Sequence, residues 1–352
     1  MISLLIAAAT SFVLTIFLTP IAIRILRERS IGQFIQEEVE GHSHKRGTPT
    51  MGGIVMVVAV VLAYVVAHFR LWSPSGGFEW RVTNISVQGW LALLALVGMG
   101  LIGFLDDYAK YARKQNLGLS KRWKFLGQLI IAGVFAWGAS AAGISTELSF
   151  TRGLGWDLGP WLYAGLVLLM LTATANAVNL TDGLDGLVAG SGALVFGAYA
   201  LIGFWQFREA AFYGVEGALE LAIVAAALSG AVGGFLWWNA APAQIFMGDV
   251  GSQALGGALA ALALLTNTHL LLVLIGGLYV METVSVILQV FSFRVFGTRI
   301  FRIAPIHHHF EMAGWPETTV IIRFWIITGI MVAVGVGIFY GDWAVANEGV
   351  LP

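Results

Sequence analysis

The feature that most constrains this chain is a series of apolar runs of about 18 to 22 residues, the length an α-helix needs to cross roughly 30 Å of hydrocarbon. Runs of about this length recur through the 352 residues. Ten are placed near 2–23, 51–68, 87–105, 125–143, 160–178, 187–204, 219–238, 252–266, 270–291 and 321–341, of which 252–266 is short. The sequence therefore predicts an all-α polytopic integral membrane protein with about ten transmembrane helices.

Composition supports this fold class and excludes some chemistry. The chain is 58% hydrophobic and 11% charged, well above the apolar fraction of a soluble domain. It has no cysteine, so disulfides and thiolate metal sites are excluded. The first run lacks a basic segment before it, which favours an uncleaved span over a signal peptide. No linker or repeat divides the chain, so residues 1–352 are expected to form a single transmembrane domain.

The distribution of Lys and Arg predicts the topology. Every second loop together holds fifteen of the nineteen basic residues. These loops are 24–50, 106–124, 179–186, 239–251 and 292–323. By the positive-inside rule they face the cytoplasm. Both termini are then expected on the outer, non-cytoplasmic side, because the number of spans is even.

Five aspartates follow apolar spans on this predicted cytoplasmic side: Asp106, Asp107, Asp182, Asp185 and Asp249. Any one of them could be a helix cap. Carboxylates at the edge of hydrocarbon are costly, however, and such acids are more often functional than structural. We therefore expect the five to converge on one site formed by the cytoplasmic loops.

Converging carboxylates repel one another, so a cation is expected among them. Oxygen ligands without cysteine favour the hard cation Mg²⁺, whose shell substrate phosphates often complete. This points to phosphate chemistry. Many nearby basic residues serve topology alone, but Lys110 lies three residues after Asp107 and so on the same helical face.

The string "APIHHHFEMAGWPE", residues 304–317, places three histidines side by side. In a helix they point in different directions, which makes a single tri-histidine metal site awkward. Contacts to phosphate or sugar oxygens are favoured, and a solvated loop is the other interpretation.

Five strings occur in an order that resembles the phospho-N-acetylmuramoyl-pentapeptide transferases. They are "KRGTPTMGG" (45–53), "DDYAK" (106–110), "NAVNLTDGLDGL" (176–187), "FMGDVGS" (246–252) and "PIHHHFE" (305–311). The aspartate strings are also shared with the wider superfamily of polyprenyl-phosphate N-acetylhexosamine-1-phosphate transferases. The resemblance runs from the first span to the last.

The resemblance implies transfer of phospho-MurNAc-pentapeptide from UDP-MurNAc-pentapeptide to undecaprenyl phosphate, which gives lipid I and UMP for the peptidoglycan of the cell wall. It implies Mg²⁺ as cofactor, the bacterial inner (plasma) membrane as location, a site facing the cytoplasm, and a homodimer as a plausible assembly. No nucleic-acid partner is expected. One substrate is soluble and the other a lipid, so the site must lie where cytosol meets bilayer.

The resemblance also implies roles for individual residues. Mg²⁺ is expected on Asp249, while Asp106 beside Asp107 acts on the lipid phosphate as base or as positioning group. Direct in-line attack is preferred to a covalent aspartyl intermediate. The catalytic set is Asp106, Asp107, Asp249 and Lys110, and the substrate-binding set is Lys45, Thr50, Lys114, Lys124, Asn179, Asp182, Asp185, Asn239, Phe246, His307, His308 and His309. Phe246 is expected to stack on uracil, and Glu282 faces the cavity or makes a structural hydrogen bond.

Two alternatives remain open from the sequence. A sister enzyme would transfer GlcNAc-1-phosphate from UDP-GlcNAc to the polyprenyl phosphate. A cation-coupled transporter would also place carboxylates in membrane helices, but usually near the midplane within paired inverted repeats.

Overall fold

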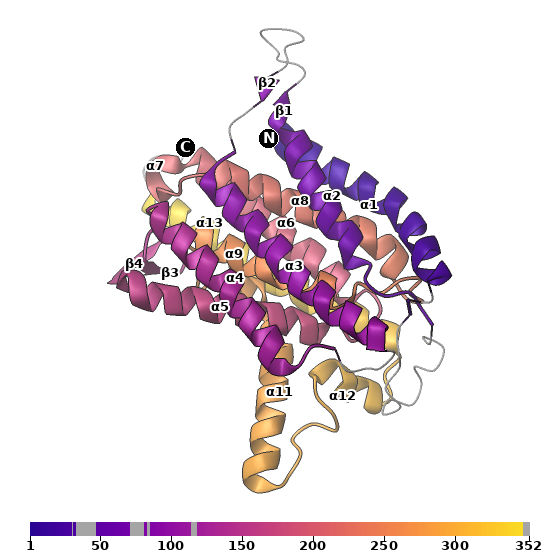
Figure 1. The fold of residues 1–352 in the computed structure, drawn as a ribbon. Coiled ribbons are helices and arrows are strands. Elements are labelled where there is room, and N and C mark those ends of the chain that lie inside the picture. Colours follow the sequence, from indigo (N-terminus) through magenta and orange to yellow (C-terminus); the bar gives the residue numbers. More distant parts are fainter. Residues whose placement is uncertain (30, 33–46, 71–80, 83–84, 114–117, 348–352) are drawn as a thin grey trace.

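A computed structural model describes residues 1–29, 31–32, 47–70, 81–82, 85–113 and 118–347. These residues form a bundle of long helices with two short hairpins (Figure 1). The helices are α1 Ile2–Glu28, α2 Gly53–His68, α3 Val87–Arg113, α4 Lys121–Ala141, α5 Gly159–Thr181, α6 Leu187–Arg208, α7 Ala210–Tyr213, α8 Ala218–Asn239, α9 Gly248–Leu265, α10 Leu272–Ile275, α11 Gly277–Phe296, α12 Ile306–Met312 and α13 Glu317–Ala346. The strands are β1 Phe69–Arg70, β2 Arg81–Val82, β3 Glu147–Ser149 and β4 Gly153–Asp157, paired antiparallel as β1–β2 and β3–β4.

The helices confirm the all-α polytopic fold class. Within the described residues, nine helices are long and apolar enough to cross a membrane, and α2 is a shorter apolar helix of 16 residues. Together they correspond to the ten apolar runs of the sequence. The start of α1 and the end of α13 lie at the end of the bundle away from α12 (Figure 1).

Two helix boundaries differ from the apolar runs in a way that matters for the site. α3 continues to Arg113, eight residues beyond the expected end of its run at 105. α9 begins at Gly248, four residues before the expected 252. A helix does not have to end where hydrocarbon ends, because its backbone hydrogen bonds form equally well beside water. The aspartates expected in loops 106–124 and 239–251 therefore lie in helices.

Helix α9 forms the centre of the bundle. All its residues from Val250 to Leu265 are buried, and it packs against α2, α3 and α5. Small residues allow this close approach, as is common in membrane helices. A Cβ atom added at Gly103 of α3 would collide with the backbone oxygen of Asp249. Glycine at 103 thus lets α3 lie directly on the first turn of α9.

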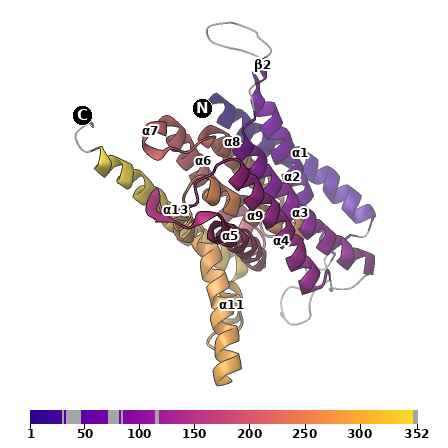
Figure 2. The ribbon, with the colours of Figure 1, turned by 60° about the vertical axis from the view of Figure 1, so that its left-hand side comes forward.

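Helix α11 leaves the bundle and projects beyond it (Figures 1 and 2). The runs 252–266 and 270–291, separated by "TNTH" in the sequence, suggest a tight helical hairpin. Residues 266–276, which include α10, join α9 to α11. α11 packs against α5 and α13 rather than along α9, so the hairpin prediction is wrong. Its exposed apolar residues, such as Ile287 and Phe291, are suited to a lipid environment.

The β3–β4 hairpin holds the end of the bundle opposite the aspartates. The backbone N–H of Ser149 donates to Nδ1 of His269 at 3.3 Å. Arg152 makes a bidentate ion pair with Asp342 of α13, with both N–O distances at 2.8 Å. These contacts tie α13 and the α9–α10 linker together far from the site.

Candidate active site

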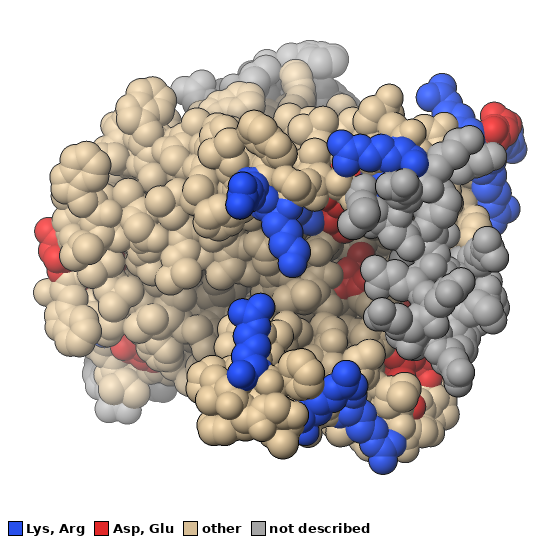
Figure 3. All heavy atoms as spheres, turned by 60° about the horizontal axis from the view of Figure 1, so that its bottom comes forward, with Lys and Arg blue, Asp and Glu red and all other residues tan. Residues whose placement is uncertain are grey.

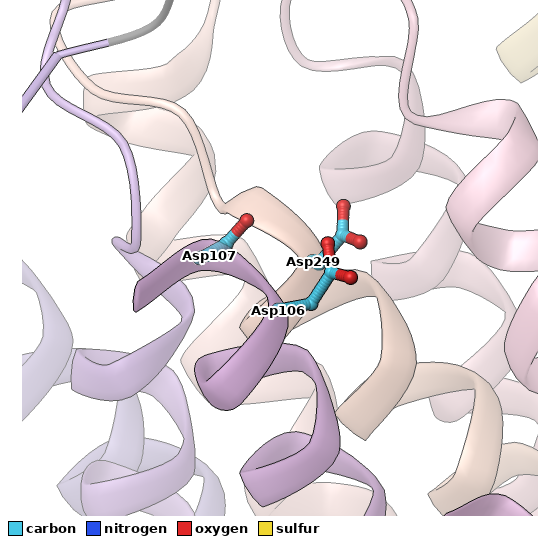
Figure 4. A group of neighbouring side chains, drawn as sticks. All are labelled: Asp106, Asp107 and Asp249. Carbon is cyan, nitrogen blue, oxygen red and sulfur yellow. The ribbon is translucent and has the colours of Figure 1, made fainter. Parts of the chain in front are cut away.

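Three carboxylates from two helices meet at one end of the bundle (Figure 4). Asp106 and Asp107 lie on α3, and Asp249 lies in the first turn of α9. Each offers one oxygen atom, and these atoms lie within 4.8 Å of one another. Asp106 and Asp107 are buried at 4% and 5% exposure. The close contact at Gly103 is what brings the two helices together at this point.

Two lysines neutralise part of this negative charge. Nζ of Lys110 lies 2.8 Å from Asp106, 3.2 Å from Asp107 and 3.3 Å from Asp249. Nζ of Lys124, from α4, lies 2.5 Å from the other oxygen of Asp249. Asp249 is therefore the carboxylate that both ammonium groups share.

Hydrogen bonds orient the carboxylates. Oδ1 of Asp106 accepts the backbone N–H of Leu119 at 2.9 Å, and Oδ2 of Asp107 accepts that of Val250 at 3.2 Å. The amide nitrogen of Asn179, on α5, donates to Oδ1 of Asp249 at 3.0 Å. Because backbone groups hold two of the carboxylates, their directions are fixed before any ligand arrives.

Gly248 forms one wall of the cluster. Its φ of +69° suits glycine. A Cβ atom there would lie 2.5 Å from Oδ2 of Asp107 and 2.9 Å from Oγ1 of Thr50. The hydroxyl of Thr50 therefore lies beside the carboxylates.

The loop 182–186 lies next to the cluster. Burial raises the pKa of Asp182 to about 8, and the negative charges of Asp249, Asp107 and Asp185 contribute to the same rise. The Asp182 carboxyl therefore favours its protonated form, which can donate a hydrogen bond, more than an ordinary aspartate does. Asp185 instead accepts the backbone N–H of Ala243 at 2.9 Å. Of the five aspartates, three form the close cluster, Asp182 lies within its electrostatic reach, and Asp185 holds a neighbouring loop.

Asn239 also holds backbone segments together. Its side-chain oxygen accepts the N–H of Gly186 at 3.1 Å, and its nitrogen donates to the carbonyl of Ile245 at 2.9 Å. The residue is 2% exposed. This arrangement favours a positioning role, while direct contact with substrate stays a prediction.

The three histidines lie in one helix, α12. The expectation that they point in different directions is wrong for His307 and His308, whose ring centroids lie 4.1 Å apart. His307 is fully buried, with Nδ1 at 3.0 Å from Oε2 of Glu282 on α11. Nδ1 of His308 lies 2.6 Å from Oε2 of Glu311. Nδ1 of His309 accepts the backbone N–H of Arg302 at 3.1 Å.

His307 and His308 both border the 182–186 loop. A Cβ atom added at Gly183 would collide with Nε2 of His307 and lie 3.2 Å from Nε2 of His308. The short helix α12 therefore lies directly against the loop that carries Asp182.

Phe246 is half-buried in a segment paired with the entry to α2. Its N–H donates to the carbonyl of Pro49 at 2.8 Å, and its carbonyl accepts the N–H of Gly52 at 2.9 Å. The backbone at 246 is thus fixed independently of its ring. Of the remaining predicted contacts, Lys45 and Lys114 lie outside the described residues.

Ser252 is a site residue that sequence reasoning missed. Its hydroxyl accepts the amide N–H of Asn179 at 2.8 Å and donates to the carbonyl of Gly248 at 3.1 Å. Since it follows Asp249 by three residues, helical spacing would have identified it if α9 had been expected to begin at Gly248.

The donor set fits Mg²⁺. Three carboxylates offer oxygen atoms, which hard cations prefer, and the contacts of Lys110 show that their oxygens already converge on a positive charge. Seen from this end of the molecule, several Lys and Arg side chains lie around recessed acidic side chains (Figure 3). Such a basic rim attracts phosphates.

Comparisons with known proteins agree on one family. The sequence pattern of glycosyl transferase family 4 matches residues 89–267, and signature 1 of the phospho-N-acetylmuramoyl-pentapeptide-transferases matches residues 45–57. The transferase of that name from Streptomyces griseus is 47% identical, over 97% of this chain and 98% of its own. The one from Kocuria rhizophila is 49% identical, over 100% of this chain and 98% of its own. The one from Frankia casuarinae is 49% identical, over 96% and 97%.

Proposed function

This chain belongs to the phospho-N-acetylmuramoyl-pentapeptide-transferase family, and on that premise we propose that the site of Asp106, Asp107 and Asp249 transfers phospho-MurNAc-pentapeptide from UDP-MurNAc-pentapeptide to undecaprenyl phosphate. The products are lipid I, a precursor of peptidoglycan, and UMP. The observation that carries this assignment of the site is the meeting of three carboxylates and two lysines at one end of an apolar bundle. Such a site serves a soluble phosphate donor and a lipid acceptor together.

Mg²⁺ is the cofactor that this donor set suits. Asp249 would hold it, and Asp106 and Asp107 lie beside it, with one oxygen of each of the three carboxylates within 4.8 Å of the others. When bound, the ion neutralises negative charge on the donor pyrophosphate.

The residues of the site position the two phosphates and stabilise charge. An oxygen of the undecaprenyl phosphate attacks the phosphorus attached to the sugar, the bond from that phosphorus to the UMP oxygen breaks, and UMP leaves with the electron pair. A phosphate monoester has its second pKa at about 6, so the acceptor is mostly ionised at neutral pH and needs little help from a base. Asp106 therefore acts mainly by positioning Lys110, its partner at 2.8 Å.

Lys110 and Lys124 supply the positive charge that this reaction needs. Phosphoryl transfer is catalysed largely by positioning and by electrostatic stabilisation of oxygens. Nζ of Lys124 contacts Oδ2 of Asp249. Nδ2 of Asn179 and Nζ of Lys110 contact Oδ1. Asp249 and its partners thus form the fixed polar surface against which the donor binds.

The charge distribution supports a cytoplasmic site. The alternate loops that hold fifteen basic residues include those around the aspartates, and the same end of the molecule shows a basic rim (Figure 3). By the positive-inside rule this end faces the cytoplasm of the bacterial cell, where the sugar nucleotide is found, and both termini lie outside.

A UMP-release assay tests this function. Purified protein with undecaprenyl phosphate and UDP-MurNAc-pentapeptide is expected to release UMP when Mg²⁺ is present and to stop when it is chelated. Release from UDP-GlcNAc instead would assign the chain to the sister reaction. Uptake of substrate into proteoliposomes without UMP release would favour a transporter.

Replacing Phe246 by alanine is expected to raise KM for the uridine substrate about tenfold, because stacking on a base contributes similarly in the ground and transition states. Turnover should change little. Phe246→Trp, which keeps an aromatic face, is the matched control and should retain a low KM. An unchanged KM in Phe246→Ala would count against stacking.

Replacing His308 by alanine should lower turnover roughly tenfold or more, because the variant loses one hydrogen bond to a charged oxygen of the substrate. The variant should still fold, because His308 lies beside the 182–186 loop with 17% of its side chain exposed. His307→Ala should affect thermal unfolding more, because it leaves the carboxylate of Glu282 buried without its partner at 3.0 Å. If both variants had normal kinetics, the predicted substrate contacts of the histidines would be wrong and their role would be structural.

A further inference from the structure

Three residues of the site each have an amide side chain one helical turn deeper in the bundle. Lys124 on α4 is followed four residues later by Gln128, and Asp249 on α9 by Gln253. α5 runs in the opposite direction and ends at the site. The residue one turn deeper than Asn179 is therefore three positions earlier, at Asn176. Residues three or four apart lie on the same face of a helix. The three amides are therefore aligned with the site residues above them.

These amides bind one another across the three helices. Nε2 of Gln128 donates to Oε1 of Gln253 at 2.7 Å, and Nδ2 of Asn176 donates to Oε1 of Gln128 at 3.2 Å. Gln128 is 1% exposed and Gln253 is fully buried. Asn176 keeps a second bond, to the carbonyl of Thr172 at 2.7 Å. We define Gln128, Gln253 and Asn176 as the amide layer.

The apolar contacts around this layer are close but not directional. α5 approaches α9 through Gly256, where a Cβ atom would lie 2.5 Å from Cα of Ala175. Contacts between small residues let backbones approach closely, and in lipid, packing and interhelical hydrogen bonds drive the association of helices in place of a hydrophobic force. A hydrogen bond between buried amides is directional and holds only over a few tenths of an ångström. A shift of one residue along a helix would move a side chain by about 1.5 Å and break it.

The contacts at the site form only when α4, α5 and α9 are in the correct register. Lys124 lies 2.5 Å from Asp249 and Asn179 lies 3.0 Å from it, and these three residues come from the same three helices as the amides. A misplacement of about 1 Å in a catalytic group can lower a rate by about a hundredfold. Two layers of polar contacts, one turn apart, constrain both rotation and translation of α4, α5 and α9.

We propose that the amide layer positions the catalytic groups, setting the register of α4, α5 and α9 so that Lys124, Asn179 and Asp249 meet. The inference rests on the proposed function of the aspartate site. Gln128 and Gln253 are positioning residues, since they act through the residues one turn above them. Removing either amide should lower kcat more than it changes KM. The reacting groups must be aligned only during the transfer step.

Methionine substitutions test this positioning role, since methionine is close to glutamine in length and shape but offers no amide. Gln128→Met and Gln253→Met are expected to lower kcat about tenfold with KM for the sugar nucleotide changed less than about twofold. Each single variant also leaves a buried amide without its partner, so its unfolding temperature should fall. UMP release and thermal unfolding in the same detergent provide the readouts.

The double variant separates positioning from simple stability. In Gln128→Met/Gln253→Met both partners become apolar, and Asn176 keeps its bond to Thr172, so the unfolding temperature should recover toward wild type. The kcat should stay about tenfold low, because the directional contact is still absent. Recovery of kcat together with stability would overturn the inference.

Gln206 on α6 offers a matched control. It is fully buried and donates to the carbonyl of Thr266 at 2.7 Å, far from the aspartates. Gln206→Met should lower the unfolding temperature and leave kcat unchanged. If the amide-layer variants lose no more turnover than Gln206→Met, the layer is structural only. Failure of the wild-type protein to release UMP would instead contradict the proposed function, so the two failures are distinguishable.

Discussion

Replacing Asp249 by asparagine is expected to reduce UMP release by about a thousandfold or more. The carboxylate is the shared partner of Lys110, Lys124 and Asn179, and it is the expected ligand of Mg²⁺. Asparagine keeps the shape but removes the charge, so metal binding weakens and the donor pyrophosphate loses its neutralising partner. The rate is measured as UMP release over a range of Mg²⁺ concentrations, and thermal unfolding checks that the variant is folded.

Asp106→Asn is the informative comparison, because both variants should fail in turnover for different reasons. Oδ1 of Asp106 accepts the N–H of Leu119, and the asparagine oxygen can still do so. The charge that positions Lys110 is lost, so attack by the acceptor should be severely slow. Binding of Mg²⁺ and the uridine nucleotide should be nearly unchanged, which calorimetry in detergent can measure.

The two binding results decide the assignment. Metal-dependent nucleotide binding should be lost in Asp249→Asn and retained in Asp106→Asn. The opposite pattern would mean that the two carboxylates have been assigned the wrong way round.

Replacing Lys124 by methionine is expected to lower turnover by about 10²- to 10³-fold, the usual cost of removing one group that stabilises developing charge. Its ammonium lies 2.5 Å from Asp249, on the carboxylate expected to hold the metal. A cation that binds Asp249 therefore competes with this ammonium. Without this competition, the Mg²⁺ concentration for half-maximal rate should stay the same or fall. The loss of activity in Lys124→Met should therefore appear in kcat.

Lys121→Met is the matched control for this prediction. Lys121 lies one turn earlier on α4 and its side chain is exposed. The change removes the same charge from the same helix without touching the carboxylates. If Lys124→Met were no slower than Lys121→Met, the contact with Asp249 would not contribute to catalysis.

Several elements of the fold and site could be read from residues alone. Ten apolar runs predicted the helices, because crossing a bilayer requires a fixed length of apolar chain with its backbone internally bonded. Asp106, Asp107 and Asp249 were expected together, since alternate loops of a polytopic chain must lie on one side. The relation of Lys110 to Asp107 followed from the three-residue spacing within one helix.

Boundaries and long-range partners were harder to predict. The apolar run ending near 105 does not show that α3 continues to Arg113, because a helix remains stable where the lipid ends. The contacts of the Asn239 amide with Gly186 and Ile245 could not be foreseen from its position in the chain, and its contact with substrate stays a prediction. Short-range patterns cannot reveal bonds between residues tens of positions apart.

The sequence by itself determined the fold class, the family and the residues able to do phosphate chemistry, because hydropathy and local motifs depend on residues close together in the chain. Only the tertiary structure decided which of these residues meet. α8 is apolar on nearly every side and α9 is buried from Val250 to Leu265, so which neighbours their faces meet cannot be read from periodicity. The contact of Lys124 with Asp249 and that of Gln128 with Gln253 each join residues 125 positions apart. Which helix faces meet depends on the whole bundle, where glycines such as Gly103 allow helices to approach closely and polar contacts add directional bonds.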